Sequence, residues 1–160
     1  MQIRSAFRRA LHDRSGAAMV EFIFAVPILL ILFAGIVELG TMMHYSHAVT
    51  DGSRAAARYL SRVEDPCDQA ELDRAAGLAA TRSTDWSGDP LFHDWPTSAA
   101  GLGSGFQVTV QECAGGALSG ETITFVTSYQ YNDAFGALFL FGYTDGFWLN
   151  GVHQEVHIGA

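Results

Sequence analysis

The sequence predicts an α+β protein in which a long N-terminal transmembrane and stalk helix is followed by a small antiparallel β-sheet head. Three observations support this prediction. An uncharged apolar run fills residues 22–37, a polar stretch with helical periodicity continues to residue 62, and short strand-like segments then alternate with glycine-rich turns. We therefore divide the 160 residues into a basic cytoplasmic leader (1–16), the helix (17–62) and an exported head (63–160).

The charge of the chain is divided as sharply as its hydropathy. The leader carries four arginines against one aspartate, whereas residues 63–160 carry two arginines against thirteen acidic residues. Arginines in front of an apolar segment predict a cytoplasmic N-terminus and a C-terminal domain in the periplasm. The acidic head lacks the basic surface that phosphate binding requires, so nucleic acid is not expected as a partner.

The apolar helix has the length of a membrane span. Residues 17–40 would cover about 36 Å as a helix, which is enough for a hydrocarbon core of about 30 Å. A cleaved secretory signal is disfavoured because the following GIVELGTMM offers no small-residue cleavage site. A buried core helix would leave the arginines unexplained. Two interpretations stay open: an unprocessed signal anchor for a periplasmic interaction domain, and a precursor that is processed near residue 16.

The spacing of Gly16, Ala17 and Glu21 favours the processed precursor. Glu21 places a carboxylate beside hydrocarbon, where a charge is costly. Cleavage after Gly16 would free an α-amine at Ala17, and residues 17 and 21 share one face of a helix. The new ammonium group would then pair with Glu21 of its own chain or of a neighbour. Gly16 alone would fit a flexible joint, but Gly16 with Glu21 five residues later favours cleavage.

Pro27 lies inside the apolar run. Proline removes a backbone donor and crowds the preceding turn, so we expect a helix kink or a loosened turn at this position. Such loosening would help a subunit to move from the bilayer into a filament. An ordinary transmembrane proline is the other interpretation.

The segment RSGAAMVEF, with the apolar run and the later SRAAARY at residues 53–59, resembles the Flp and TadE-like pilins of tight-adherence (Tad) systems. In these families a basic leader ends in glycine, and a glutamate–aromatic pair follows, matched here by Glu21 and Phe22. The resemblance covers residues 14–62. It implies a minor pilin, or pseudopilin, that an aspartic prepilin peptidase cuts between Gly16 and Ala17. The mature subunit would pack into a Tad pilus or initiate one.

The same resemblance implies the partners and the location of the protein. The implied partners are other Tad pilin subunits and minor pilins, the prepilin peptidase, and the inner-membrane assembly platform with its ATPase. The protein would cross the inner membrane once, and its mature form would reach the extracellular pilus and support adhesion or biofilm formation. The resemblance implies a structural subunit, with no enzymatic activity and no cofactor.

The helix beyond Glu38 is expected to be amphipathic. Arg54, Arg58 and Arg62 form a ladder spaced four residues apart near its end, where cations also suit the helix dipole. The ladder would contact an acidic head on an adjacent subunit or form a solvated face, and the solvated face is favoured. Gly52 is a weak point. A stripe spaced three and four residues apart is expected to pack on a partner surface: Leu39, Met42, Ser46, Val49, Ser53, Ala56, Leu60 and Val63.

The head is expected to contain one helix and three strands. The helix covers residues 70–82, and a loop rich in glycine, proline and aspartate follows to residue 105. An aromatic segment at 135–148 is expected in the core or at an interface, with a glycan- or surface-binding patch as the alternative. The strand-like segments are 106–113 and 121–131, which would form a hairpin, and 150–160.

Cys67 and Cys113 both lie beyond the apolar run. In an oxidising compartment we expect a disulfide bond between them, and two separate buried thiols are the alternative. Metal binding is disfavoured. The histidine pairs lack a third ligand at a recognisable spacing, and the aspartates are better explained as turn residues than as calcium ligands. The residues concerned are His44 with His47, His153 with His157, and the three aspartates Asp85, Asp89 and Asp94.

Overall fold

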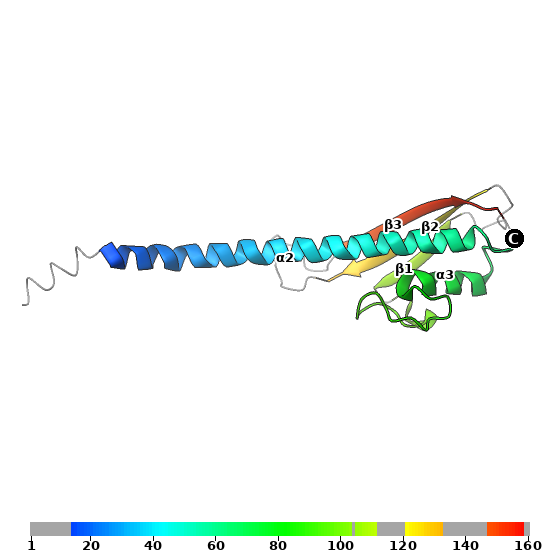
Figure 1. The fold of residues 1–160 in the computed structure, drawn as a ribbon, viewed down its shortest axis with the longest axis horizontal. Helices are drawn as coiled ribbons and strands as arrows, with labels where there is room; N and C mark the ends of the chain where they lie inside the picture. The colour runs from blue at the N-terminus through cyan, green and yellow to red at the C-terminus, as the bar shows by residue number, and fades with distance from the viewer. Residues whose placement is uncertain (1–13, 104, 112–120, 133–146, 159–160) are drawn as a thin grey trace, which may run out of the picture.

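The computed structural model describes residues 14–103, 105–111, 121–132 and 147–158. A long helix leads from the N-terminal side into a small head, and a second helix and a sheet lie along its far half (Figure 1). The α+β architecture predicted from the sequence is therefore confirmed. The elements in chain order are α2 (Arg14–Leu60), α3 (Gln69–Thr81), the short 3-10 helix η1 (Ala99–Gly101), β1 (Phe106–Gln111), β2 (Thr122–Tyr131) and β3 (Phe147–Val156).

The first half of α2 stands free of the head. From Ala18 to Val37 no side chain is buried, and large apolar side chains such as Phe22 and Ile36 are 67% and 70% exposed. We call residues 18–37 the bare segment. Within the described residues, one helix is long and apolar enough to cross a membrane, and it contains the bare segment. So large an apolar surface is unfavourable in water, and the bare segment therefore suggests a membrane anchor.

The second half of α2, residues 38–60, packs against the head, and we call it the covered segment. Val49, Ala56 and Leu60 are fully buried in a core shared with α3 and the sheet. The expected stripe is thus present from Met42 onward. The expectation that it packs on a partner surface is wrong for this part of the helix, because the chain's own head covers it. Leu39, the first residue of the stripe, is exposed.

The sheet is antiparallel with the order β1-β2-β3. Thr127 in the central strand is paired with Val108 on one side and with Gly151 on the other. The hairpin predicted from residues 106–131 is confirmed. β3 begins at Phe147 and not at residue 150, because Phe147 to Leu149 continue the ladder opposite the end of β2. In β3 the alternation places Val152 outward and Gly151 against α2.

Two glycines allow the covered segment to approach its neighbours closely. A Cβ atom on Gly151 would lie 2.6 Å from the carbonyl oxygen of Val49, and one on Gly52 would lie 2.6 Å from that of Ala79 in α3. Ser53 adds a polar contact at the crossing, since its Oγ lies 2.8 Å from the carbonyl oxygen of Gly151. Gly52 is therefore a packing residue, and the expectation of a weak point in the helix is corrected.

Candidate functional site

The start of α2 carries the residues predicted for processing. The described part of α2 already includes Arg14, so the bond between Gly16 and Ala17 lies inside a helix and not before it. Gly16 is exposed, and nothing lies within 4 Å of the position that a Cβ atom would take. A peptidase that requires extended backbone would need to unwind the helix locally at this bond, and cleavage itself stays a prediction.

Glu21 follows Ala17 by four residues in the same continuous helix, so the two positions share a face. Glu21 is exposed, and among the described residues it has no ion-pair partner. Phe22, the aromatic residue of the predicted motif, projects from the bare segment. The arrangement leaves both side chains accessible to a neighbouring molecule, and their pairing and assembly roles stay predictions.

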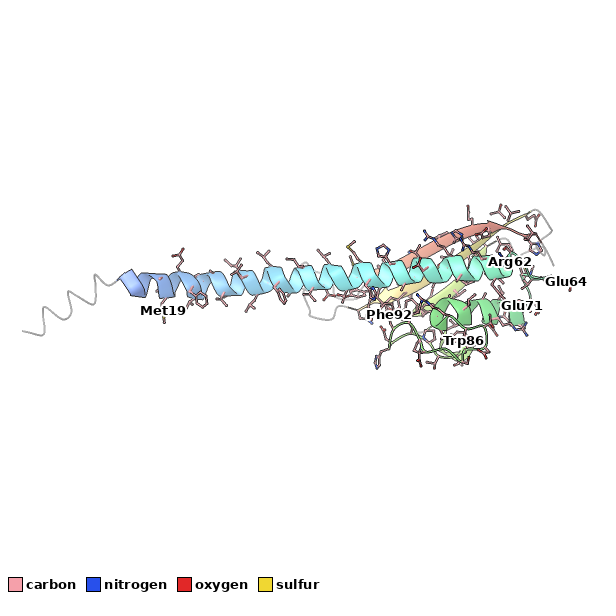
Figure 2. All side chains as sticks on the ribbon, in the orientation of Figure 1. Met19, Arg62, Glu64, Glu71, Trp86 and Phe92 are labelled. Atoms are coloured by element: carbon pink, nitrogen blue, oxygen red, sulfur yellow. The ribbon has the colours of Figure 1, made fainter. Side chains whose placement is uncertain are left out.

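α2 continues through Pro27 as one helix (Figure 1). Pro27 is exposed, like most of the bare segment. In Figure 2 the side chains around Met19 point away from the helix on all sides without meeting another element. The kink predicted at Pro27 stays a prediction.

A buried carboxylate marks the point where the bare and covered segments meet. Glu38 is 3% exposed, and the hydroxyl group of Tyr131, itself 2% exposed, donates a hydrogen bond to its Oε1. The same hydroxyl lies 3.3 Å from Oγ1 of Thr41. Sequence reasoning missed this contact. Its signal was a second carboxylate at the far end of the apolar run, but the partner lies 93 residues away.

A cluster of aromatic side chains, which we call the aromatic collar, surrounds this end of the head. It consists of Tyr45, Phe92, Trp95, Phe106 and Tyr129. Tyr45 stacks on Phe92 with ring centroids 3.8 Å apart and on Tyr129 at 5.1 Å. Figure 2 shows Phe92 at the end of the head that is nearer to Met19. The collar thus gives the head a broad apolar attachment to α2.

Asp94 adds a charge at the edge of the aromatic collar. The hydroxyl group of Tyr129 donates a hydrogen bond to its Oδ2, and that of Tyr45 lies 3.4 Å from its Oδ1. Burial of Tyr129, together with the hydrogen bond to Asp94 and the negative charge of Asp94, raises the pKa of Tyr129. Asp94, which the sequence offered as a calcium ligand or a turn residue, therefore serves as a hydrogen-bond acceptor for tyrosine.

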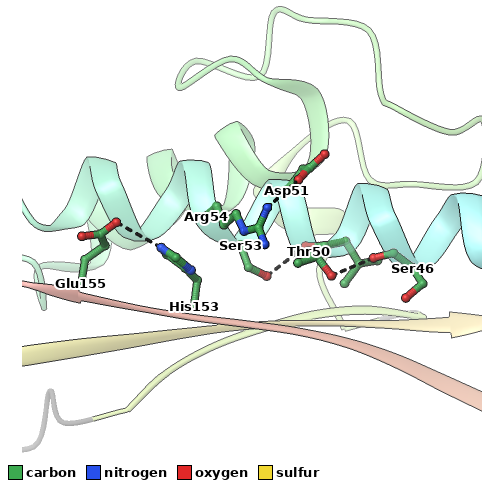
Figure 3. A network of polar contacts seen from close by, with 8 residues as sticks. Ser46, Thr50, Asp51, Ser53, Arg54, His153 and Glu155 are labelled. Carbon is green, nitrogen blue, oxygen red and sulfur yellow. Dashed lines mark hydrogen bonds and ion pairs between the residues drawn. The ribbon is translucent and has the colours of Figure 1, made fainter.

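Arg54 and Arg58 of the arginine ladder lie on the exposed side of the covered segment. Arg62 follows in a turn, because α2 ends at Leu60 and not at the expected residue 62. Arg54 forms a long ion pair with Asp51 at 3.5 Å, as Figure 3 shows. Arg58 lies 3.5 Å from Glu155 in β3, and Glu155 also accepts from His153 at 3.0 Å. The hydrogen bond from His153 and the nearby positive charges lower the pKa of Glu155. The three ladder arginines are exposed, and their contact with another subunit stays a prediction.

The other predicted sites fall partly outside the described residues. Cys67 is disulfide-bonded, but Cys113 lies outside them, so the pairing stays a prediction. Most of the aromatic segment 135–148 also lies outside the described residues. His44 packs edge-on against Phe92, and Nε2 of His157 lies 2.9 Å from the carbonyl oxygen of Val63. Within the described part of the chain, no group of three or more potential ligands is placed to hold a metal ion.

Comparison with known proteins identifies the first part of this arrangement. The model of the family described as TadE-like protein matches residues 16–58. The match begins at Gly16 and ends near the end of α2, so the resemblance inferred from the sequence is confirmed for this segment. The TadE-like region associates the chain with the structural components of Tad pili. The comparisons with curated proteins and with solved structures found no match.

Proposed function

We propose that this chain, whose residues 16–58 form a TadE-like region, is a minor pilin or pseudopilin of a Tad-type pilus. The precursor crosses the inner membrane once, with its leader in the cytoplasm and its head in the periplasm. Prepilin peptidase cuts it between Gly16 and Ala17. The mature subunit then packs into the filament or initiates it through the bare segment, with the help of the assembly platform and its ATPase, and supports surface adhesion.

One observation carries this proposal: the family match, residues 16–58, begins at Gly16 and includes the whole bare segment of α2. The match starts at Gly16, directly before the bare segment, where no side chain is buried. A membrane anchor alone would need such a segment, but it would not need a glycine and a glutamate five residues apart in front of it. A filament subunit uses the same surface twice, first against lipid and then against other pilin helices.

The cleavage step is tested by intact mass. The full chain is co-expressed with a Tad prepilin peptidase, and we expect a product that lacks residues 1–16 and begins at Ala17. Gly16→Leu should block this loss. Gly35→Leu is the matched control, because Gly35 also has nothing within 4 Å of its Cβ position and lies far from the scissile bond. Full-length wild-type chain under these conditions would contradict the proposal and favour an unprocessed signal anchor.

The charge-pairing step is tested separately through Glu21. Glu21→Ala should still be cut after Gly16 but should reach sheared pili in much smaller amounts, because the new α-amine at Ala17 loses its counter-charge. Glu21→Gln keeps the size of the side chain and should behave like Glu21→Ala. Normal pilus incorporation of both variants would refute the pairing argument while leaving the cleavage proposal intact.

A further inference from the structure

The covered segment and α3 form an open groove at the end of the head that is farthest from the bare segment. Its volume is about 560 Å³, and one side of it carries two arginines of the ladder, Arg58 and Arg62. Figure 2 places Arg62, Glu64 and Glu71 together at this end of the molecule. The lining residues are Ala55, Arg58, Tyr59, Arg62, Val63 and Leu78. We call this site the arginine groove.

Glu71, on α3 beside the groove, already has two partners for its carboxylate. Tyr59 donates a hydrogen bond of 2.5 Å to Oε2 of Glu71, and Arg74 pairs with Oε1 of the same carboxylate at 2.5 Å. Arg58 keeps 68% of its side chain exposed despite its long contact with Glu155. Within the described residues, Arg62 forms no ion pair. The groove therefore presents positive charge that the described part of the head leaves largely unsatisfied.

The complementary negative charge lies on the turn between α2 and α3. Glu64, Asp65 and Asp68 are all exposed there, in a head whose charge is strongly negative. This acidic turn follows the arginine ladder directly along the long axis of the molecule. The helical part of the ladder, from Arg54 to Arg58, spans about 6 Å at 1.5 Å per residue, and Arg62 follows two residues after α2 ends at Leu60. If two copies lie parallel, a shift along the axis by the length of the ladder places the acidic turn of one copy beside the ladder of the next.

We propose that the arginine groove receives the acidic turn of a second copy of this chain. The contact is heterologous, because the groove of one copy meets the turn of the other, and such a contact propagates along an axis instead of closing on itself. The proposal rests on the proposed function and concerns copies of this chain that lie parallel, with an axial shift, in the filament or in the complex that initiates it. It adds an electrostatic contact between heads to the apolar packing of the helices.

The chain contains no lysine, and this allows a specific test. Arg62→Lys introduces the only side-chain amine, which a zero-length carbodiimide reagent joins to a carboxylate only if the two groups touch. The full chain is reacted in membranes that contain a mixture of ¹⁵N-labelled and unlabelled copies, and the products are digested and weighed. We expect mixed-isotope peptides that join position 62 to Glu64, Asp65 or Asp68 of the other copy.

Three controls define the result. Wild type, which lacks a side-chain amine, gives the background from the α-amine. Arg58→Lys should couple to Glu155 within one chain, which proves that the reagent works. Arg82→Lys presents an exposed amine outside the groove and should give no mixed-isotope product.

The acidic turn is tested by neutralising it. In the Arg62→Lys background, the combination of Glu64→Gln, Asp65→Asn and Asp68→Asn removes the carboxylates that the reagent activates, so the mixed-isotope product at position 62 should be lost. Each single variant should remove only the product at its own position. Absence of the mixed product while Arg58→Lys couples to Glu155 would overturn the proposal. Equal dimer yields for Arg82→Lys and Arg62→Lys, or coupling of position 62 only to a different protein, would also overturn it.

These outcomes are separable from those of the cleavage experiment. A cleaved chain without the mixed-isotope product would leave the pilin proposal standing and remove the head contact. An uncleaved chain that still gives the product would show self-association of a membrane-anchored head and would remove the pilin proposal.

Discussion

The bare and covered segments of α2 are parts of one unbroken helix, yet they interact with their surroundings in opposite ways. The bare segment exposes large apolar side chains on every side, whereas the covered segment uses small residues to bring other elements close. Ser53, Ala56 and Ala57 are fully buried there. The difference shows that helix continuity does not imply one environment: side-chain size decides which part meets lipid or other helices and which part holds a head.

The largest effect is expected when a glycine is replaced by alanine in the covered segment and, for comparison, in the bare segment. Gly52→Ala places a Cβ atom 2.6 Å from the carbonyl oxygen of Ala79, whereas Gly35→Ala, in the bare segment, meets nothing within 4 Å. We expect Gly52→Ala to lower the free energy of unfolding of the head by about 3 kcal/mol through overpacking. Gly35→Ala should be neutral or stabilise the helix by up to about 1 kcal/mol. Thermal unfolding of the full chain in detergent, followed by circular dichroism, measures both.

The difference in stability between the two glycine-to-alanine variants tests the division of α2 into two segments. If both variants unfold at the same temperature, the close approach of α2 and α3 at Gly52 does not contribute to stability. The division of α2 into a bare and a covered segment would then need to be redrawn.

A smaller loss is expected at the boundary of the segments. Tyr131→Phe removes the hydroxyl group that donates to buried Glu38, and a lost hydrogen bond to a charged group costs about 1.5–2 kcal/mol. Tyr45→Phe is the matched control, because its hydroxyl group makes a long and exposed contact with Asp94 and its loss should cost much less. Chemical denaturation monitored by tryptophan fluorescence compares them, and equal losses would contradict a special role for Glu38.

Alkaline pH is expected to weaken the covered segment through Tyr129. Because its pKa is raised in the folded chain above the ordinary value of 10.0, the unfolded chain loses its proton first as the pH rises. The contribution of Tyr129 to the free energy of unfolding should therefore be constant below pH 10, and the free energy of unfolding should fall as the pH increases beyond it. The free energy of unfolding of the Tyr129→Phe variant should fall less steeply over the same pH range. Equal slopes for variant and wild type in unfolding experiments would exclude Tyr129 as the cause.

The smallest effect concerns Asp85, in the loop that follows α3. Hydrogen bonds from the hydroxyl groups of Ser83 and Ser87 and from the Ser87 backbone hold the pKa of Asp85 at about 2, below its usual 3.8. The local stabilisation is present above pH 3.8 and is lost as the pH falls toward 2. A carbon-detected NMR titration should find the Asp85 carboxyl midpoint at about 2, and Ser83→Ala should raise it. A midpoint near 3.8 in wild type would show that these hydrogen bonds do not form in solution.

The sequence predicted the parts of this molecule that depend on local pattern. The 16-residue apolar run predicted the bare segment, spacing of three and four residues predicted the buried stripe, and alternation predicted the strands β1 and β2. It did not predict which surface covers the stripe, because amphipathicity indicates a buried face without naming its partner. The contact of Glu38 with Tyr131 was equally out of reach, since the two lie on elements that only the tertiary fold brings together.

The processing site and the arginine groove differ in how far the sequence predicted them. Gly16, Ala17 and Glu21 were recognised from their spacing, and the family match covers all three. The arginine groove was not recognised, although its arginines were. Its second wall comes from Leu78 in α3, and the approach of α3 depends on Gly52, which local reasoning took for a weakness.

Because α2 is one unbroken helix, it also fixes the rotation of Glu21 about the helix axis relative to the head. Each residue of a helix turns the chain by about 100° and advances it by about 1.5 Å, so the number of residues between Glu21 and Ser53 sets the direction in which Glu21 points relative to the head. One extra residue between Gly35 and Ile36 would rotate Glu21 by about 100°, whereas seven extra residues would return it to within about 20°. The length of α2 therefore sets the direction in which Glu21 points, and this determines which neighbouring molecule Glu21 faces when the head is held in place.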